Sequence, residues 1–232
     1  MVNENKTDVI VVGAGPAGVS AAVTIARGGK KVVLVERGDF AGSKNMYGGV
    51  IYEHAVKELF PDYIETAPIE RFVSSHSYML MSDGQSTNIT YKNHTDKGNA
   101  FIAIRSKWDK WCVEQAIQAG VYFSPNTLVN NLIVKDGKIV GIKTDLEEYF
   151  ADLVIIADGV NSLLAKQIGL RDEIKPKHTA LGVKEVIKLP EELINQRFGL
   201  QGSDGAAYEL VGGALSGMLA LGLSLIHISE PT

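Results

Sequence analysis

Three glycines near the N-terminus have the spacing of a turn that could hold phosphate groups. They occur in Asp8-Val-Ile-Val-Val-Gly13-Ala-Gly15-Pro-Ala-Gly18, directly after a short β-branched run that is typical of a buried strand. Gly13 suits a tight turn off the strand, Gly15 would let a pyrophosphate approach the backbone, and Gly18 would let the next helix pack closely on the sheet. The N-terminus of that helix would offer N–H groups and the positive end of its dipole to the phosphates.

An acidic residue, Glu36, follows about twenty residues after this turn, where a dinucleotide-binding unit carries its acid. The sequence predicts a buried strand at Val9–Val12, a helix at Pro16–Arg27 and a second buried strand at Lys31–Val35. These elements form a parallel β-α-β unit with a right-handed crossover, and Glu36 ends its second strand. An acid there accepts hydrogen bonds from ribose hydroxyls and disfavours the 2′-phosphate of NADP. The unit predicts dinucleotide binding, but its fingerprint alone does not distinguish FAD from NAD.

Length, composition and charge are those of an ordinary globular protein. The 232 residues are 45% hydrophobic and 22% charged, with a net charge of −4, so one or two domains are expected and a nucleic-acid partner is not. The one cysteine, Cys112, cannot form an intrachain disulfide or hold an iron–sulfur cluster alone. We interpret it as a buried residue that shares a helix face with Trp108 and Ala116. The histidines show no metal-ligand spacing, so no metal site is predicted.

No segment is expected to direct the chain out of the cytoplasm or to span a membrane. The N-terminus, polar up to Thr7, lacks the pattern of a signal peptide. Leu210–Ser229 is uncharged and long enough to cross a bilayer, but it contains four glycines and has no flanking cationic residues. A transmembrane helix is therefore the less favoured interpretation of this stretch.

The rest of the chain is predicted to be mostly β-strand, with a few helices. Two hairpin turns are indicated, at Ser82-Asp-Gly-Gln and at Asp136-Gly137. The predicted strands are Tyr78–Met81, Thr87–Tyr91, Phe101–Ile104, Val129–Lys135, Lys138–Thr144, Glu148–Phe150, Leu153–Ala157 and Thr179–Leu189, and the predicted helices are Lys107–Ala119, Ser162–Ile168 and, after a glycine-rich turn, Gly48–Leu59.

Two motifs resemble those of FAD-dependent hydroxylase-like flavoproteins. Ala157-Asp158-Gly159-Val160-Asn161-Ser162 follows a buried strand and opens a helix, as does the Asp-Gly motif that lies near the cofactor in those enzymes. Arg105, before the Trp108 helix, matches the arginine that they place on the flavin side of the site. In the alternative interpretation, Asp158 is only an acid that the dipole of the following helix favours.

A narrower resemblance, to the FixC and electron-transfer-flavoprotein:quinone oxidoreductase family, runs from about Asp8 to about Gly213 and favours the FixC branch. It implies an α/β fold, with a Rossmann-like FAD/NAD(P)-binding domain built on a parallel sheet and the start of a mixed β-sheet substrate or quinone domain. The motifs that carry it are Glu36-Arg37-Gly38, Gly42-Ser-Lys44-Asn45-Met-Tyr-Gly48-Gly49 with Tyr52, Gly182-Val-Lys184-Glu185-Val-Ile, Leu189-Pro190 and Arg197-Phe198.

The resemblance implies a flavoprotein dehydrogenase whose FAD is reduced by an electron transfer flavoprotein and reoxidised by a quinone. The resemblance to the FixC branch also implies a separate ferredoxin-like partner, which fits a chain that lacks the cysteines that bind the iron–sulfur cluster of the longer members. The implied location is cytoplasmic, peripheral on the inner face of the cell membrane. Catalytic residues stay unassigned, because the cofactor carries the chemistry. The cofactor-binding residues are expected to be Gly13, Ala14, Gly15, Pro16, Ala17, Gly18, Glu36, Arg37, Lys44, Asn45, Arg105, Asp158 and Gly159.

The chain departs from the family pattern in its length, because the family continues with another sheet, a further FAD-contacting segment and C-terminal helices. We expect a FAD-binding β-α-β unit and flavin loop at 1–60, an inserted β segment at 61–100, the remainder of the FAD-binding domain at 101–175 and the start of the second domain at 176–222. Residues 223–232 resemble the translated read-through of a sequencing adapter, and we expect a non-native tail there.

Two alternatives stay open. One is an FAD-dependent monooxygenase or a geranylgeranyl-reductase-like enzyme, which shares the glycine fingerprint and the Asp-Gly turn but takes its electrons from NAD(P)H. The other is a truncated, non-functional fragment, which folds poorly and holds no cofactor.

Overall fold

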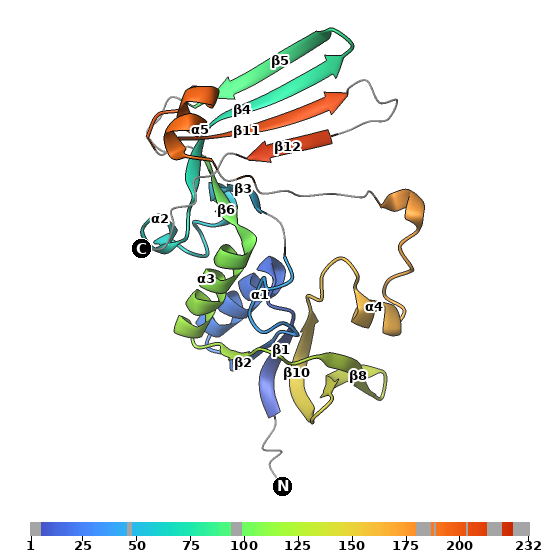
Figure 1. The fold of residues 1–232 in the computed structure, drawn as a ribbon. Helices are drawn as coiled ribbons and strands as arrows, with labels where there is room; N and C mark the ends of the chain where they lie inside the picture. The colour runs from blue at the N-terminus through green and yellow to red at the C-terminus, as the bar shows by residue number, and fades with distance from the viewer. Residues whose placement is uncertain are drawn as a thin grey trace. The chain divides into compact units, whose positions relative to one another are not determined.

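The structure, a computed structural model, divides into two compact units, and each unit is built from two separate stretches of the sequence (Figure 1). The first comprises Met1–Met46 and Ser106–Val183, and the second comprises Tyr47–Arg105 and Lys184–Thr232. The domain boundaries expected from the sequence stay a prediction. The structure describes residues 6–45, 48–93, 99–179, 187, 189–202, 204–212 and 220–224.

A six-stranded sheet in the order β7-β2-β1-β10-β9-β8 forms the centre of the first unit. Strand β1 pairs in parallel with β2 and β10, and β2 pairs in parallel with β7, whereas β8, β9 and β10 pair antiparallel. The elements of this unit are β1 (Lys6–Val12), α1 (Pro16–Arg27), β2 (Val32–Val35), α3 (Arg105–Gln118), β7 (Tyr122–Ser124), β8 (Val129–Lys135), β9 (Lys138–Thr144), β10 (Glu148–Ile156), α4 (Leu163–Gln167) and the 3₁₀ helix η2 (Pro176–His178).

Apolar residues at the strand and helix positions expected from the sequence build the core of this unit. In β1, Val9–Val12 is buried throughout, because the strand lies in the middle of a sheet that is covered on both faces. Helix α1 packs against β1 and β2 and buries Val19, Ala22 and Val23. Leu164 of α4 joins the core cluster that contains residues of β1, β9 and β10. The predicted β-α-β unit is thereby confirmed.

Helix α3 also forms as predicted, with Trp108, Cys112 and Ala116 buried at one-turn intervals. The centroids of the indole rings of Trp108 and Trp111 lie 4.9 Å apart, and Cys112, which forms no disulfide, is buried. Cys112 is therefore a core residue, and burial is the usual setting of a cysteine outside a disulfide.

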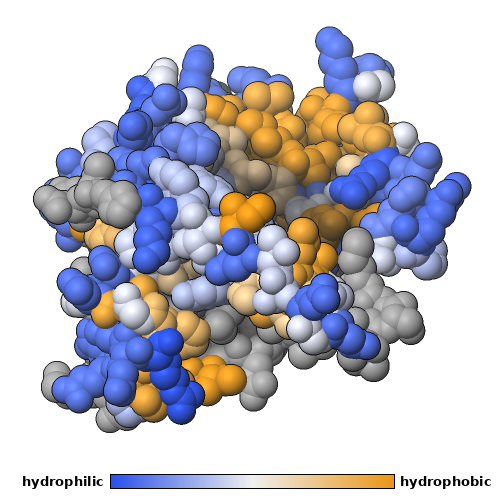
Figure 2. Space-filling model, turned by 90° about the horizontal axis from the view of Figure 1, so that it is seen from above, coloured by the Kyte–Doolittle hydropathy of each residue, from blue (hydrophilic) through white to orange (hydrophobic). Residues whose placement is uncertain are grey.

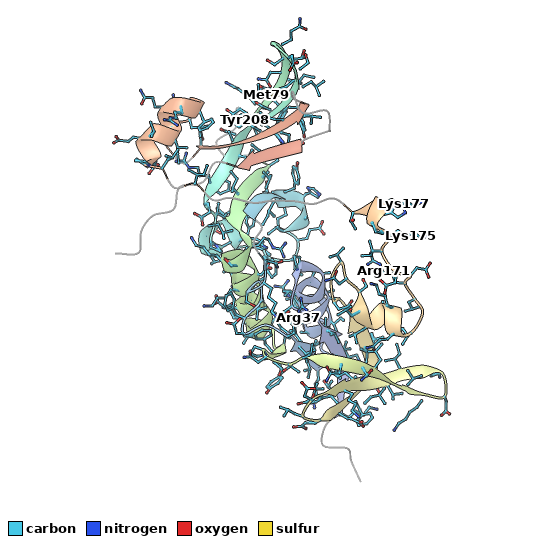
Figure 3. All side chains as sticks on the ribbon, turned by 45° about the vertical axis from the view of Figure 1, so that its right-hand side comes forward. Arg37, Met79, Arg171, Lys175, Lys177 and Tyr208 are labelled. Atoms are coloured by element: carbon cyan, nitrogen blue, oxygen red, sulfur yellow. The ribbon has the colours of Figure 1, made fainter. Side chains whose placement is uncertain are left out.

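A second sheet, in the order β12-β11-β4-β6-β3, forms the centre of the second unit, and β5 pairs with β4. Strand β4 pairs in parallel with β11 and antiparallel with β5 and β6. Met79 and Tyr208 lie on the neighbouring strands β4 and β11 (Figure 3). The elements are β3 (Gly48–Tyr52), the 3₁₀ helix η1 (Glu53–Ala55), α2 (Tyr63–Thr66), β4 (Arg71–Ser82), β5 (Gln85–Lys92), β6 (Ala100–Ile104), α5 (Glu191–Phe198), β11 (Asp204–Gly212) and β12 (Ala220–Ser224).

A buried arginine, Arg71, ties helix α5 to this sheet. Its Nη1 donates hydrogen bonds to Oδ1 of Asn195 at 2.7 Å and to the carbonyl oxygen of Asp204 at 2.6 Å. Its Nη2 lies 3.7 Å from a carboxylate oxygen of Glu191, which is partly exposed. Because Asn195 and Glu191 belong to α5 and Asp204 begins β11, one guanidinium group connects the helix with two strands.

We expect Arg71→Met to destabilise the protein by about 2 kcal/mol, because the partly buried amide of Asn195 and the carbonyl group of Asp204 lose their donor. The measurement is the urea dependence of the circular dichroism signal. The matched control is Arg197→Met, which removes an exposed arginine from the same helix. Equal unfolding midpoints for the two variants would contradict the assigned role of Arg71.

Two predictions about local structure are wrong. The predicted helix in Gly48–Leu59 is instead β3 followed by η1, because Gly48 and Gly49 pair antiparallel with Ile104 and Ala103 of β6. The separate strands predicted at Glu148–Phe150 and Leu153–Ala157 are one strand, β10. Its first residues pair with β9 and its later ones with β1, so the polar interruption at Asp152 does not break the strand.

The last third of the chain is described only in part. The strand predicted over Thr179–Leu189 lies almost wholly outside the described residues. Of Leu210–Ser229, the described residues belong to β11 and β12. None of the helices in the described ranges is long and apolar enough to cross a membrane.

Candidate functional site

The carboxyl ends of three strands meet at the glycine turn. β1, β2 and β10 end at Val12, Val35 and Ile156. The backbone N–H of Gly13 donates to the carbonyl oxygen of Val35 at 2.8 Å, and that of Ala157 donates to the carbonyl oxygen of Val12 at 2.8 Å. In the sheet, β2 and β7 lie on one side of β1, and β10 lies on the other side. The turn after β1 is therefore at the point where the strand order reverses, and open α/β sheets bind their ligands at such points.

The three glycines of the turn have different steric surroundings. Gly13 has a φ of +102°, and a Cβ there would overlap the carbonyl oxygen of Ala157. A Cβ at Gly18 would overlap the carbonyl oxygen of Gly13, so α1 approaches the turn as closely as a helix can. Gly15 differs from both, because no atom lies within 4 Å of the place where its Cβ would be. The space in front of Gly15 therefore fits a pyrophosphate.

Helix α1 begins at this open space. Gly15 is its N-cap residue and provides no side-chain cap, Pro16 is its first residue, and its first turn carries no acidic side chain. The backbone at Ala17 and Gly18 thus presents the positive end of the helix dipole without a competing carboxylate of its own first turn. These features fit the diphosphate of a dinucleotide.

The carboxylate of Glu36 holds the loops on both sides of the expected ribose position. It accepts hydrogen bonds from the backbone N–H of Ala14 at 3.0 Å and from that of Gly38 at 2.8 Å. Each bond uses a different carboxylate oxygen, and an ionised carboxylate has about four acceptor positions. Glu36 can therefore bind ribose hydroxyls while it keeps both backbone contacts.

A cavity of about 290 Å³ in the first unit brings together predicted residues from three separate stretches of sequence. Those that line it are Gly13, Gly15, Glu36, Arg37, Lys44, Asn45, Asp158 and Gly159. Ala14, Pro16, Ala17 and Gly18 flank it in the turn and in the first turn of α1, whereas Arg105 begins α3 and does not line this cavity. Contact of each residue with a cofactor stays a prediction.

A buried acid that the sequence analysis did not select, Asp109, holds the loop at Lys44 and Asn45. The side-chain amide of Asn45 donates a hydrogen bond to Oδ2 of Asp109 at 2.9 Å, and Asp109 is only 2% exposed. The sequence feature that could have identified Asp109 is its place next to Trp108, on the buried part of helix α3. Asp109 thus positions the loop on which two predicted cofactor residues lie.

A chain of hydrogen bonds stabilises the turn at Asp158 and Gly159. Oδ2 of Asp158 accepts from the backbone N–H of Leu164 at 2.9 Å, so this acid stabilises the start of α4 besides lining the cavity. Ser162, with a left-handed φ of +46°, donates from Oγ to the carbonyl oxygen of Gly159 at 2.9 Å. Nη1 of Arg171 donates to the same Oγ at 2.6 Å and so supports a strained residue.

We expect Arg171→Met to weaken FAD binding about fivefold, because Ser162 loses the bond that restrains its unfavourable backbone conformation. FAD affinity is measured by the quenching of flavin fluorescence. Lys175→Met is the matched control, since Lys175 is an exposed cation on the same segment (Figure 3). A similar change in both variants would show that the loss of charge, and not the bond to Ser162, affects binding.

Within the described ranges, no group of three histidine, cysteine, aspartate or glutamate side chains could hold a metal ion. The residues that line the cavity include the glycines of the turn after β1, the acid Glu36 and the cations Arg37 and Lys44. This donor set fits a dinucleotide.

The fold and this cavity are those of a dinucleotide-binding protein, and comparison with known proteins gives the family. The family model described as FAD dependent oxidoreductase matches residues 8–166, which include most of β1 and the Asp158 turn. The chain belongs to this family of FAD-dependent oxidoreductases, and the predicted cofactor, FAD, is thereby confirmed.

Within this family, the chain is similar to FixC proteins. It is 40% identical over its whole length to protein FixC of Salmonella typhi and 40% identical over 96% of its length to that of Azorhizobium caulinodans. It is 37% identical over 95% of its length to a protein of Escherichia coli strain K12 named a probable electron transfer flavoprotein-quinone oxidoreductase. The aligned part is 54%, 52% and 52% of these three proteins, so the chain spans about half their length.

Solved structures share the fold. A geranylgeranyl bacteriochlorophyll reductase-like protein of Thermoplasma acidophilum matches 95% of this chain and 56% of its own, with a TM-score of 0.67 and 21% identity. FqzB matches 89% of this chain and 48% of its own, with a TM-score of 0.64 and 19% identity. The α/β fold expected from the sequence is confirmed, with a dinucleotide-type sheet in the first unit and a mixed sheet in the second.

Proposed function

We propose that the chain is the flavin-binding part of an oxidoreductase that passes electrons from an electron transfer flavoprotein to a quinone. The observation that carries this proposal is the 37% to 40% identity, over 95% or more of the chain, to FixC proteins and to the probable electron transfer flavoprotein-quinone oxidoreductase. The site is consistent with this proposal, because an electron-transfer protein depends on a tightly bound cofactor more than on a side-chain nucleophile or a metal ion.

In this proposal, bound FAD supplies the two-electron chemistry, and the residues of the chain hold and tune it. The N-terminus of α1 and the open backbone at Gly15 bind the diphosphate. Glu36 accepts from the ribose hydroxyls. Asp158 and Gly159 close the cavity from the side of β10. Lys44 and Asn45, on the loop that Asp109 holds, lie beside the flavin.

An exposed lysine at the cavity, Lys44, is assigned an electrostatic role. A positive charge beside the flavin stabilises its reduced, anionic form, so we expect Lys44→Ala to lower the flavin reduction potential by about 20–30 mV. The potential is measured by titration against a reference dye. The matched control is Lys30→Ala, which removes an exposed lysine after α1. An unmoved potential in Lys44→Ala would show that this charge does not act on the flavin.

The proposed function is tested with the FAD-loaded protein under anaerobic conditions. A reduced electron transfer flavoprotein is expected to bleach the flavin absorbance, and a quinone is expected to restore it. Flavin that neither reaction changes would contradict the proposal. A purified protein without flavin absorbance would instead support the fragment interpretation, in which the chain holds no cofactor.

The rival function is that of an FAD enzyme driven by NAD(P)H. The observation that favours it is the shared fold with the geranylgeranyl bacteriochlorophyll reductase-like protein, which at 21% identity is a likeness of fold alone. Rapid bleaching of the flavin by NADH or NADPH would support this rival and contradict the electron-transfer proposal.

The partners in this proposal are an electron transfer flavoprotein, a ferredoxin-like protein and a quinone. The ferredoxin-like protein would supply an iron–sulfur centre, and the single cysteine of this chain cannot ligate such a cluster by itself. We place the protein in the cytoplasm, at the inner face of the cell membrane where quinones reside. Co-purification of the tagged protein with a ferredoxin-like protein tests this partnership.

A further inference from the structure

A buried carboxylate in the first unit, that of Asp109, has its polar partner at the cofactor cavity. Hydrophilic residues cover much of the face shown in Figure 2, whereas Asp109 is only 2% exposed. Trp108 and Trp111, its neighbours on helix α3, are buried as well. Oδ2 of Asp109 accepts a hydrogen bond from Nδ2 of Asn45 at 2.9 Å. Because a buried acid without a donor is costly, this bond is a defined feature of the fold.

Asn45 is held through both its main chain and its side chain. Its backbone N–H donates to the carbonyl oxygen of Gly42 at 2.9 Å, and Gly42 has the left-handed φ of +83° that this turn requires. Its side-chain amide donates to Asp109 on helix α3. The two contacts fix the place of Asn45 and the orientation of its amide group. Asn45 also lines the cavity, so this amide is available to a group bound there.

The contact with Asp109 determines which end of the amide is available. Nδ2 of an asparagine only donates and Oδ1 only accepts, and a carboxylate likewise only accepts. A rotated amide would place Oδ1 of Asn45 against Oδ2 of Asp109 and lose the hydrogen bond. Asp109 therefore keeps the nitrogen on its own side and leaves the oxygen for another donor. Among the described residues, no group donates to Oδ1 of Asn45.

Flavin changes its hydrogen-bonding character at one ring nitrogen, N5, when it is reduced. In the oxidised ring, N5 only accepts. The reduced, anionic ring has taken up two electrons and one proton, and its N5 carries a hydrogen atom that it can donate. Hydrogen bonds to the ring nitrogens are one means by which a protein tunes a flavin. A carbonyl oxygen at N5 therefore opposes the oxidised form and stabilises the reduced form.

We infer that Asp109 is a positioning residue that turns Oδ1 of Asn45 toward N5 of the flavin, so that the protein binds reduced FAD more tightly than oxidised FAD. The inference rests on the proposed function, in which Asn45 lies beside the flavin. Lys44 acts in the same direction through its charge, whereas Asp109 acts through the amide of Asn45. The resulting rise in potential favours electron transfer from the electron transfer flavoprotein to this flavin.

The test measures the reduction potential of the FAD-loaded protein, by anaerobic titration with dithionite against a reference dye. Asp109→Leu replaces the carboxylate by an apolar side chain of similar size, so the amide of Asn45 loses its acceptor and can rotate to donate to oxidised N5. We expect the preference for reduced over oxidised FAD to fall about tenfold, the effect of one hydrogen bond. For a two-electron couple, a tenfold change lowers the potential by about 30 mV.

A second variant separates the hydrogen bond from the charge of Asp109. Removal of a negative charge near the flavin raises the potential, which is opposite to the effect expected from rotation of the amide. Asp109→Asn removes the charge but keeps a carbonyl oxygen that can accept from Asn45. We therefore expect its potential to be equal to that of the wild type or higher, while that of Asp109→Leu falls. A rise in both variants would overturn the inference.

Asn45→Ala, at an exposed position, tests the same bond without changing the buried residue. We expect it to lower the preference for reduced FAD about tenfold, and Asp109→Leu to lower it no further in the Asn45→Ala background. The matched control is Glu114→Leu, which removes an exposed carboxylate from the same helix and is expected to leave the potential unchanged. Flavin absorbance and circular dichroism confirm that each variant is folded and loaded.

The outcomes separate this inference from the proposed function. A wild-type potential in Asn45→Ala would overturn the inference, and so would an equal fall on Asp109→Leu with and without Asn45. Either result would leave the proposed function intact, because dithionite replaces the electron transfer flavoprotein and no quinone is present. The proposed function is decided independently by whether the electron transfer flavoprotein reduces the flavin and the quinone reoxidises it.

Discussion

Gly15→Val is expected to abolish FAD binding while the protein stays folded. Gly15 has a φ of −73°, which any residue adopts, and its Cβ position is open. The Cβ of a valine there meets no protein atom within 4 Å, and its branches extend into the space that a pyrophosphate needs. We expect the dissociation constant for FAD to rise by more than about 100-fold, and the free energy of unfolding of the cofactor-free protein to change by less than about 1 kcal/mol.

The measurements are flavin fluorescence titration for affinity and urea unfolding of the cofactor-free protein for stability. Ser20→Val is the matched control, because it places the same side chain at an exposed position further along α1. A Gly15→Val protein that binds FAD normally would show that the phosphates do not approach this backbone. Loss of folding would show that Gly15 has a structural role that its surroundings do not reveal.

Gly18→Val is expected to destabilise the first unit, in contrast to Gly15→Val, which is expected to leave its stability unchanged. Its Cβ would overlap the carbonyl oxygen of Gly13, which is backbone and is held by the paired ends of β1 and β2. The overlap can be relieved only by moving α1 away from the sheet. We expect a loss of more than about 3 kcal/mol, which lowers the melting temperature by about 10 °C.

The control for Gly18→Val is Ala17→Val, at the exposed neighbouring position of the same helix. That change costs only the difference in helix propensity, less than about 1 kcal/mol. Differential scanning calorimetry of the cofactor-free proteins measures both. A Gly18→Val protein with the melting temperature of the wild type would mean that α1 does not pack on the turn as closely as the structure shows.

The β-α-β unit could be predicted from the sequence because its signals are local. The apolar run at Val9–Val12, the glycine spacing and the helix face all follow one another within about thirty residues. Helix α3 was predictable for the same reason. The strand β3 was not, because it forms by pairing with β6, which lies about fifty residues away in the sequence.

Some residues of the candidate site could likewise be predicted from the sequence, and others could not. Its glycines and Glu36 could be found because the type and spacing of these residues are characteristic. Asp109 and Arg171 could not, because their roles depend on hydrogen bonds to Asn45 and Ser162 that form only in the folded chain. A cavity of about 520 Å³ in the second unit is likewise formed by residues from four strands, and no single stretch of sequence marks it.

The position of β1 in its sheet has a consequence for synthesis of the chain. One edge of β1 pairs with β2, which follows at once, but the other pairs with β10, which is made more than a hundred residues later. At roughly 5–20 residues per second, the ribosome leaves that apolar edge unpaired for on the order of ten seconds. An unpaired edge of this kind can associate with other chains. The nascent protein should therefore depend on chaperones until β10 emerges.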